Sequence, residues 1–525
     1  MDLRPRISRI FRSGRWDRGN KERASGNADI FLLKNSSCSR QSRSQGSQMR
    51  VLYSPYLWLT MDTQQIAQHI LDIATKKKVD FCEVAVFKNE FLLKRLRRGQ
   101  VDQPPAEESW GVDMAIVKGK RRKSITFDNP LLAERMIEKS LEYLKFLPEH
   151  EITLPRQVFE KAQCVANSFD EETALLEDSR LLEVVLQLNS ALEAKGLILS
   201  GKITAGRGEI YYMNSIGSAQ SCVYTLVGSG FFSFDLKDAS ISAYANTGGS
   251  SFESLDLERV SQELISKCEL QRQLPKGDIF EKLREGNDLR MDVILEPYFL
   301  EPIFDWLGFF GFNGLMVERG ESFISKKIGQ ELLGKNIDIS DNPLDSRLQG
   351  IAVPFDFEGM PRSQVMLAQK GRIMNALYDS ELARRLGKES TGNALPPSQR
   401  AEGAAPFNLV VEGGKSSLEE MIDSCQQPTL WITKLHYLGM KHFQTATMTG
   451  IAQHGVFLIE KGKVSQCMEN VRFEEIIPEA LKRVEMMGPS RLVFDPMSAG
   501  MPSGTVVPAM KIKDFRFVGS TKRTM

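Results

Sequence analysis

Two acidic residues alternate with two aromatic rings in the segment Phe355-Asp356-Phe357-Glu358-Gly359. This alternation predicts a strand that carries both acids on one face and both rings on the other. Further along the chain, Ser390-Thr391-Gly392-Asn393 is a run of small polar residues, which predicts a loop. We expect the two segments to bind a ligand or to hold neighbouring backbone closely. The alternative is structural, namely an edge strand whose acids face solvent, followed later by an ordinary turn.

The residues between these segments predict the elements that position them. Residues 365–367 are apolar and form a second short strand, which Lys370-Gly371 ends because glycine tolerates a positive φ. A helix is expected over residues 379–386, with Asp379 or Ser380 as its N-cap. The small polar loop then follows this helix.

A second pair of carboxylates, Glu301 and Asp305, lies in an apolar segment that is expected to be helical over residues 299–310. Residues four apart share one helix face. Two carboxylates on one face can bind a metal ion or move a proton, so both are candidate catalytic residues. They can equally well face solvent and have no chemical role.

Three histidines, His436, His442 and His454, together with Cys467, are further candidates for metal binding. Their spacing matches no zinc-binding pattern, so we expect ordinary surface or core histidines. His436 and His442 remain the alternative metal ligands if a site exists. The sequence contains no HExxH, GxGxxG, P-loop or GxSxG motif.

Composition describes an ordinary globular protein. The 525 residues include 68 Lys and Arg against 67 Asp and Glu, so the overall charge predicts no polyanionic partner. The seven cysteines are dispersed and form no CxxC pair, which is typical of reduced thiols in the cytoplasm. Acids and prolines interrupt the most apolar run, residues 293–312, and we therefore expect neither a membrane span nor a membrane partner.

Residues 1–60 differ from the rest of the chain. They contain 12 Lys and Arg against four Asp and Glu, with little periodicity, and this composition predicts disorder. One interpretation is that translation begins at Met61 and that the leader is an extension of the gene model. The alternatives are a basic arm for nucleic acid and an Arg-rich and Ser-rich targeting segment.

Linker segments around residues 148–155 and 274–277 divide the remainder into three units, residues 61–150, 151–277 and 278–525. The first two units alternate helices with antiparallel strands. Many short strands in the last unit predict a rolled or barrel-like sheet with helices outside it. The fold class is therefore α+β, with a mixed N-terminal half and a β-rich C-terminal half.

Several motifs in this order resemble the TldD/PmbA family of metallopeptidase-related proteins, which are also called modulators of DNA gyrase. The motifs are residues 214–217, 355–359, 390–393, 413–422, 450–463 and 506–512. The resemblance covers roughly residues 61–520. It implies an α+β N-terminal half joined to a β-rich C-terminal half, and an activity on unfolded peptides, as in the maturation of peptide precursors.

Catalytic members of this family carry HExxxH on a helix of the third unit, where the histidines hold Zn²⁺ and the glutamate activates water. A cysteine near the C-terminus is a further ligand. Here the corresponding segment, residues 299–306, has no histidine, and no cysteine follows Cys467. This pattern is similar to the PmbA branch, also called TldE. It implies a subunit that holds no zinc itself and a TldD-like catalytic subunit as its partner, with a homodimer as the other possibility.

Two further hypotheses remain open at this point. The chain is either an active hydrolase with an unrecognised metal site, built from Glu301, Asp305, His436 or His442, or a binding protein whose basic leader contacts nucleic acid. Balanced overall charge makes nucleic acid the less expected partner.

Overall fold

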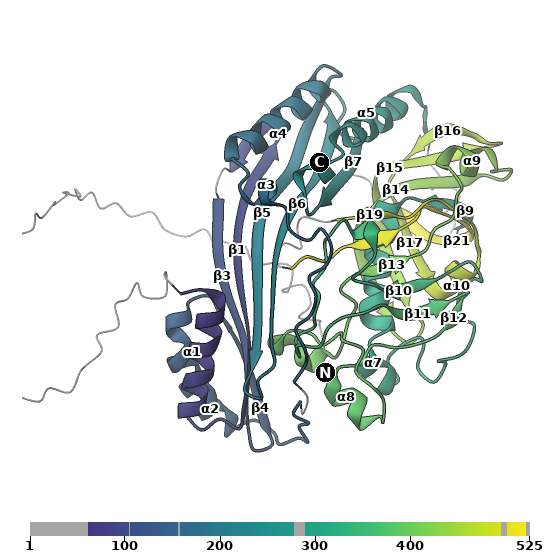
Figure 1. Cartoon of the computed structure of the whole chain (residues 1–525). Helices are drawn as coiled ribbons and strands as arrows, with labels where there is room; N and C mark the ends of the chain where they lie inside the picture. The colour runs from purple at the N-terminus through teal and green to yellow at the C-terminus, as the bar shows by residue number, and fades with distance from the viewer. Residues whose placement is uncertain (1–60, 104–105, 156–157, 278–288, 495–500, 521–525) are drawn as a thin grey trace, which may run out of the picture. The chain divides into compact units, whose positions relative to one another are not determined.

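The structure is a computed structural model that describes residues 61–103, 106–155, 158–277, 289–494 and 501–520. The basic leader, residues 1–60, and the predictions made for it lie outside the described residues. Figure 1 labels many of the helices and strands of the described part.

The first sheet has seven strands in the order β4-β3-β1-β5-β6-β7, with β2 paired to β1. β1 and β5 run antiparallel from the pair Glu83 and Asn214 to the pair Leu96 and Gly201. The boundary predicted at residue 150 therefore falls between two segments that share one sheet. The strands are β1 Phe81–Arg97, β2 Gln100–Gln103, β3 Ala106–Lys118, β4 Arg121–Phe127, β5 Leu197–Asn214, β6 Ala219–Asp235 and β7 Ser242–Gly249.

Helices cover this sheet at both of its ends (Figure 1). α1 (Thr63–Lys76) and α2 (Ala133–Leu144) share an apolar core with β1, β3 and β4. α4 (Asp178–Glu193) and α5 (Leu257–Gln273) share another with β5, β6 and β7. The short α3 spans Glu171–Ala174, and single turns lie at η3 (Pro130–Leu132) and η4 (Phe252–Ser254).

A side-chain cap fixes the start of α1. Asp62 is the N-cap and accepts a hydrogen bond from the Gln65 amide at 2.7 Å. The side chain of Thr63 is buried and donates to Glu209. Aspartate is as good an N-cap as threonine, and its position one residue earlier leaves Thr63 free to face the sheet.

Two further sheets form the C-terminal half. One has the order β12-β11-β10-β13-β20-β19, and the other the order β14-β9-β21-β17-β15-β16-β8 with β18 on β21. β14 also pairs with β15, so β14, β9, β21, β17 and β15 close into a ring. This closure confirms the predicted barrel-like half.

The strands of this half are β8 Lys276–Gly277, β9 Leu289–Leu295, β10 Ile339–Asp341, β11 Val365–Gln369, β12 Arg372–Ile373, β13 Leu409–Val411, β14 Thr429–His442, β15 Thr447–Glu460, β16 Lys463–Met468, β17 Val471–Ile476, β18 Val484–Met487, β19 Arg491–Val493, β20 Thr505–Val507 and β21 Met510–Ser520. Its helices and turns are α6 Pro297–Trp306, η6 Leu307–Gly311, α7 Gly314–Glu318, η7 Ser346–Leu348, α8 Ser380–Arg385, η8 Pro397–Glu402, α9 Leu418–Asp423 and α10 Ile477–Lys482.

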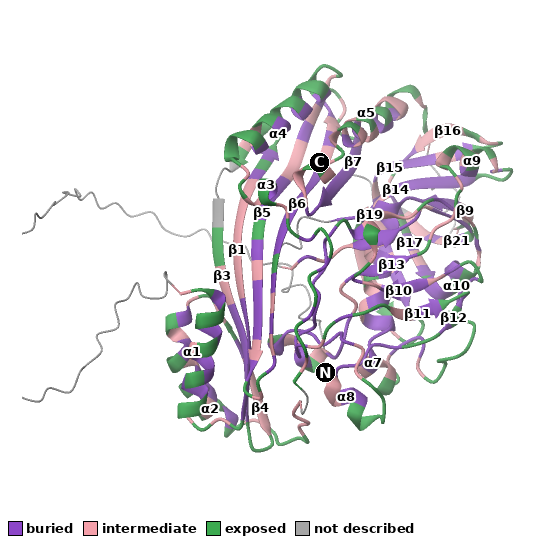
Figure 2. Ribbon diagram, viewed as in Figure 1, coloured by how far each residue is buried: buried purple, intermediate pink, exposed green. Residues whose placement is uncertain are grey.

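The largest apolar core lies in this C-terminal half. It joins α6 to the ring strands through aromatic residues such as Phe299, Phe473 and Phe515. Figure 2 shows the ring strands mostly buried, whereas α1, α2 and α4 expose their outer faces. Among the described helices, none combines the length and the apolar character that crossing a membrane requires.

Candidate functional site

Residues 355–359 form a turn, and the strand predicted for them is wrong. Phe355 makes an isolated bridge to Pro361, and the Gly359 amide donates to the Asp356 carbonyl at 2.9 Å. The Asp356 carboxylate accepts from the amides of Glu358 at 3.0 Å and Met360 at 2.9 Å. A short acidic side chain that bonds to nearby amides competes with strand pairing, which explains why the turn forms.

The acids of this turn do not face solvent, so the edge-strand alternative is also wrong. Asp356 is 0% exposed and Glu358 is 5% exposed. Burial raises the pKa of Asp356 to about 7, and the neighbouring Glu358 contributes to the rise. Burial also raises the pKa of Glu358, which Arg400 opposes.

The small polar loop, residues 390–393, adjoins the turn. Asp356 accepts from the amide of Ala394, the residue after the loop, at 3.0 Å. Both Ser390 and Thr391 donate to the Tyr378 carbonyl, from the hydroxyl of Ser390 at 3.1 Å and the amide of Thr391 at 2.9 Å. The loop therefore serves to hold the backbone in place.

The last two residues of the loop have separate tasks. Gly392 has φ +72°, a conformation that favours glycine. Asn393 donates from Nδ2 to Asp341 at 2.6 Å. Arg362 donates to the same carboxylate oxygen at 2.7 Å, and both partners of that ion pair are buried. The loop and the turn are thus tied to β10, which ends at Asp341.

Glu358 points toward the start of α8. Its Oε2 atom accepts from the amide of Ser380 at 2.9 Å and from the hydroxyl of Ser380 at 2.5 Å. α8 begins where predicted, with Asp379 as its N-cap, and Asp379 accepts from the Leu382 amide at 2.8 Å. Burial raises the pKa of Asp379 as well.

Arg400 of η8 connects this region to the first sheet. Its Nη2 atom donates to Glu83 of β1 at 3.0 Å and to the Phe357 carbonyl at 2.5 Å, and its Nη1 atom lies 3.7 Å from Glu358. Arg122 of β4 also donates to Glu83. We call Glu83, Arg122, Glu358, Asp379 and Arg400 the charge cluster.

The charge cluster contains residues that the sequence analysis missed. Glu83 and Arg122 looked like ordinary polar residues of strands, and Arg400 like a loop residue. Although burial opposes the charge, Glu83 and Glu358 hold the pKa of Arg400 above its ordinary value. In the cluster, Glu83 pairs with Arg122 and Arg400, and Glu358 pairs with Arg400, which is the arrangement expected of a structural joint.

The candidate acids Glu301 and Asp305 lie elsewhere, on α6. Glu301 is half-buried, whereas Asp305 is exposed and accepts a hydrogen bond from the Thr505 hydroxyl. The opposite face of α6 packs Phe299 and Phe304 fully into the core. The helix is therefore an apolar core element with two acids on its outer side.

The structure does not bring His436 and His442 together. Both side chains are exposed on β14, and six residues of strand separate them by roughly 20 Å. His454 is buried, and its Nδ1 atom lies 3.0 Å from the Ser242 hydroxyl. Two ligands to one metal ion must lie within a few ångströms of each other, so His436 and His442 cannot share one within a chain.

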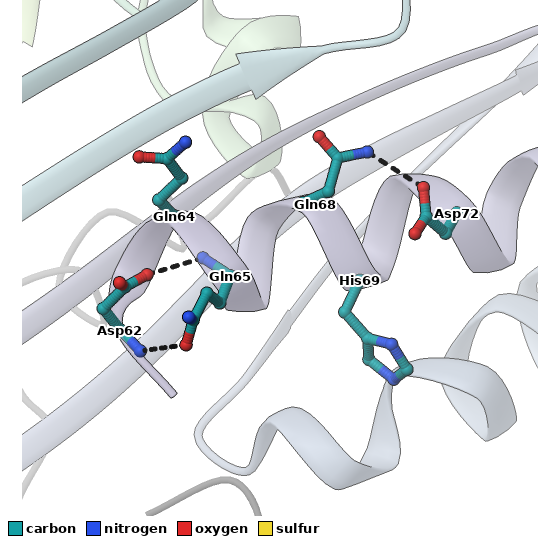
Figure 3. A pocket seen from close by; sticks show the side chains of 6 residues that line it. All are labelled: Asp62, Gln64, Gln65, Gln68, His69 and Asp72. Atoms are coloured by element: carbon teal, nitrogen blue, oxygen red, sulfur yellow. Dashed lines mark hydrogen bonds between the residues drawn. The ribbon is translucent and has the colours of Figure 1, made fainter. Parts of the chain in front are cut away.

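Two hollows of the described surface contain none of these candidates. One is formed by the exposed polar face of α1, where Asp62 bonds to Gln65 and Gln68 donates to Asp72 at 2.9 Å (Figure 3). Another, of about 210 Å³, lies between β1, β5 and α3. The α1 side chains bond mainly to one another, and this hollow is a feature of the helix surface.

Comparison with known proteins identifies a family domain in the C-terminal half of the chain. Residues 288–519 match the family described as the PmbA/TldA metallopeptidase C-terminal domain. The chain therefore carries a PmbA/TldD-family domain. This match confirms the family indicated by residues 355–359 and 390–393, both of which lie within the PmbA/TldD domain.

Solved structures share the fold. The crystal structure of TldE from Thermococcus kodakarensis matches 86% of this chain and 100% of its own length, with a TM-score of 0.72 and 18% identity. A proposed modulator of DNA gyrase from Bacteroides thetaiotaomicron matches 88% of this chain and 100% of its own length, with a TM-score of 0.71 and 16% identity. These likenesses confirm the α+β fold class.

Sequence relatives are distant. An uncharacterised protein of Methanocaldococcus jannaschii is 25% identical over 325 residues, which cover 59% of this chain and 70% of that protein. A protein named metalloprotease in Methanothermobacter thermautotrophicus is 25% identical over 181 residues, which cover 33% of this chain and 37% of the relative. The alignment with the relative named metalloprotease thus spans less than half of its length.

The family name raises the question of whether α6 of the PmbA/TldD domain could hold zinc. The helix offers only Glu301 and Asp305 as donors, and Asp305 already accepts from Thr505. Zinc in proteins usually has about four ligands, mostly His and Cys. Across the described residues, no three His, Cys, Asp or Glu side chains are arranged to hold a metal ion. The residues present on α6 do not fit a catalytic zinc ion.

Proposed function

We propose that this chain is a PmbA/TldE-like subunit of a zinc peptidase that acts on unfolded peptides, and that a TldD-like partner supplies the zinc. The observation that carries the proposal is the composition of α6. Phe299 and Phe304 fill the core from this helix, and no residue between 299 and 306 is a histidine. Zinc-dependent hydrolysis then needs ligands from another chain.

The comparisons support the proposal at the level of family and fold. Relatives named metalloprotease align with this chain, and the TldE structure has the same fold over most of its length. A heterodimer with a TldD-like chain is the assembly that we propose, and a homodimer is the competing one. Free cysteines throughout the described residues are in keeping with a reducing, cytoplasmic location.

Within this proposal the charge cluster has a definite task. Glu83 and Arg122 belong to the first sheet, whereas Glu358 and Arg400 belong to the PmbA/TldD domain. Their pairing fixes the sheet against the domain, so that both present one rigid surface to a partner or peptide. The cluster carboxylates bond to arginines and to backbone amides, which gives them a structural role.

A reconstitution assay tests the proposal. The purified chain is incubated with an unstructured peptide, either alone or with a TldD-like protein that contains HExxxH. We expect no cleavage by the chain alone and zinc-dependent cleavage by the mixture. Because α6 has no catalytic role in this account, Glu301→Gln should leave the activity of the mixture unchanged. Cleavage by the chain alone that is lost in Glu301→Gln would overturn the proposal.

A further inference from the structure

Residues 158–170 cross one face of β6 and are called the strap. Gln220 of β6 bonds to the strap through both the oxygen and the nitrogen of its side-chain amide. Its Oε1 atom accepts from the Ala162 amide at 2.8 Å, and its Nε2 atom donates to the Glu160 carbonyl at 2.8 Å. The strap reaches the edge of β6 where the Thr225 amide donates to the Ser168 carbonyl at 2.9 Å.

These two anchors place one cysteine of the strap and one of β6 on adjoining segments. Cys164 lies two residues beyond Ala162 on the strap, and Cys222 lies two residues beyond Gln220 on β6. Alternate side chains of a strand share a face, so Cys222 faces the strap as Gln220 does. Ala162 and Cys222 belong to the same apolar cluster, which places the strap over this part of the strand.

The two thiols differ in accessibility. Cys164 is exposed, whereas Cys222 is 2% exposed. Burial raises the pKa of Cys222 to about 12, and the proximity of Cys164 adds to the rise. An oxidant from solvent therefore meets Cys164 first, and Cys222 lies behind it as the second thiol.

We propose that Cys164 and Cys222 are an oxidative modification site, at which hydrogen peroxide oxidises Cys164 and Cys222 closes a disulfide. The Cys164 sulfur attacks one peroxide oxygen, the O–O bond breaks, and a sulfenic acid and water form. The Cys222 sulfur then attacks the Cys164 sulfur, the S–O bond breaks, and the hydroxyl leaves as a second water with the thiol proton. The two cysteines lose two electrons in total, and the peroxide gains them.

The position of the pair gives the disulfide a structural consequence. Gln220 also donates to the Gly359 carbonyl at 2.8 Å, so one side chain joins the strap to the turn at residues 355–359. Val165 of the strap belongs to one apolar cluster with Val410 and Val506 of the PmbA/TldD domain. A disulfide at Cys164 would thus fasten the strap beside the contact between the sheet and the domain. This inference does not depend on the proposed peptidase role.

Peptide mapping of the full chain after treatment with hydrogen peroxide tests the inference. We expect a peptide linked through Cys164 and Cys222, about 2 Da lighter than the two reduced peptides together, which dithiothreitol separates again. Oxidation should also slow proteolysis within the strap. Cys467→Ser, which removes a partly exposed cysteine elsewhere, should form the same link as the unaltered chain.

The single variants give opposite results if the order of reaction is correct. In Cys222→Ser, Cys164 has no resolving thiol and should proceed to the sulfinic acid. In Cys164→Ser, buried Cys222 should remain a thiol. Sulfinic acid at Cys164 of the unaltered chain, or a link from Cys164 to any other cysteine, would overturn the inference.

Discussion

Arg400 donates to Glu83 at 3.0 Å, and the two residues are 317 positions apart in the sequence. Both side chains are almost completely buried. Glu83 belongs to the sheet that precedes the PmbA/TldD domain, and Arg400 belongs to the domain itself. This ion pair is therefore a direct link between the two halves of the described chain.

Removal of one partner should be costly. Arg400→Met leaves the Glu83 carboxylate with a buried charge that Arg122 only partly compensates, and we expect a loss of about 3–5 kcal/mol in the free energy of unfolding. Urea denaturation measures this loss. The matched control is Arg372→Met, because Arg372 pairs with Glu331 on the surface, where both side chains are about half exposed. That variant should lose less than about 1 kcal/mol. Equal losses in the two variants would show that the buried pair of Arg400 and Glu83 stabilises the fold no more than a surface pair does.

Two glycines of the family motifs should resist substitution. Gly359 has φ +80° and Gly392 has φ +72°. An added Cβ would lie 3.1 Å from the Tyr212 ring in Gly359→Ala and 3.3 Å from the Pro361 carbonyl in Gly392→Ala. We expect each change to cost more than about 1 kcal/mol in thermal or urea denaturation.

A third glycine separates backbone strain from crowding. Gly387 also has a positive φ, of +65°, but nothing lies within 4 Å of its added Cβ. Gly387→Ala should therefore cost only the backbone term, about 1 kcal/mol. If Gly359→Ala is no more harmful than Gly387→Ala, the close contact with Tyr212 is not significant.

Asp113 should make stability depend on pH. Its carboxylate accepts from the Ser398 amide at 2.8 Å, and burial raises its pKa to about 7. In the unfolded chain this carboxyl has a pKa of about 4. Between about pH 4 and about pH 7, Asp113 is therefore protonated in the folded state but ionised in the unfolded state. Stability supplied by this group is therefore lost as the pH rises from about 4 to about 7 and is level above that range.

Asp113→Asn removes this titration. Between about pH 5 and about pH 8, the free energy of unfolding should fall less in the variant than in the unaltered chain, by on the order of 2–3 kcal/mol. The comparison is made between the two pH values within each protein, so a constant loss from the weaker contact with Ser398 cancels. Asp72→Asn, at an exposed position on α1, is the control and should change nothing. Parallel pH profiles for Asp113→Asn and the unaltered chain would refute the prediction.

Local signals predicted much of the fold. Asp379 before an amphipathic run correctly indicated the start of α8, and Lys370-Gly371 the end of β11. The predictions failed where hydrogen bonds from side chains to the backbone decide the local structure in place of hydrophobic periodicity. The alternation in residues 355–359 has the period of a strand, but the Asp356 carboxylate bonds to the amides of Glu358 and Met360 and forms a turn.

The partners of the site were harder to predict than its motifs. Residues 355–359 and 390–393 have unusual local composition, and the structure does bring them together at Asp356 and Ala394. Glu83 and Arg400 have ordinary local surroundings, and their pairing depends on how the sheet meets the domain. Single-sequence reasoning contains no information on that long-range contact, because each residue alone resembles a solvated surface charge.

The central claim is that this chain contributes no catalytic zinc, and elemental analysis of the purified chain tests it most directly. The chain is equilibrated with zinc, freed of loosely held metal, and measured before and after a TldD-like partner is added. We predict well below one zinc per chain alone, and one zinc per heterodimer, held by the HExxxH of the partner. One tightly held zinc per chain in the absence of a partner, lost in His436→Ala or His442→Ala, would contradict the account.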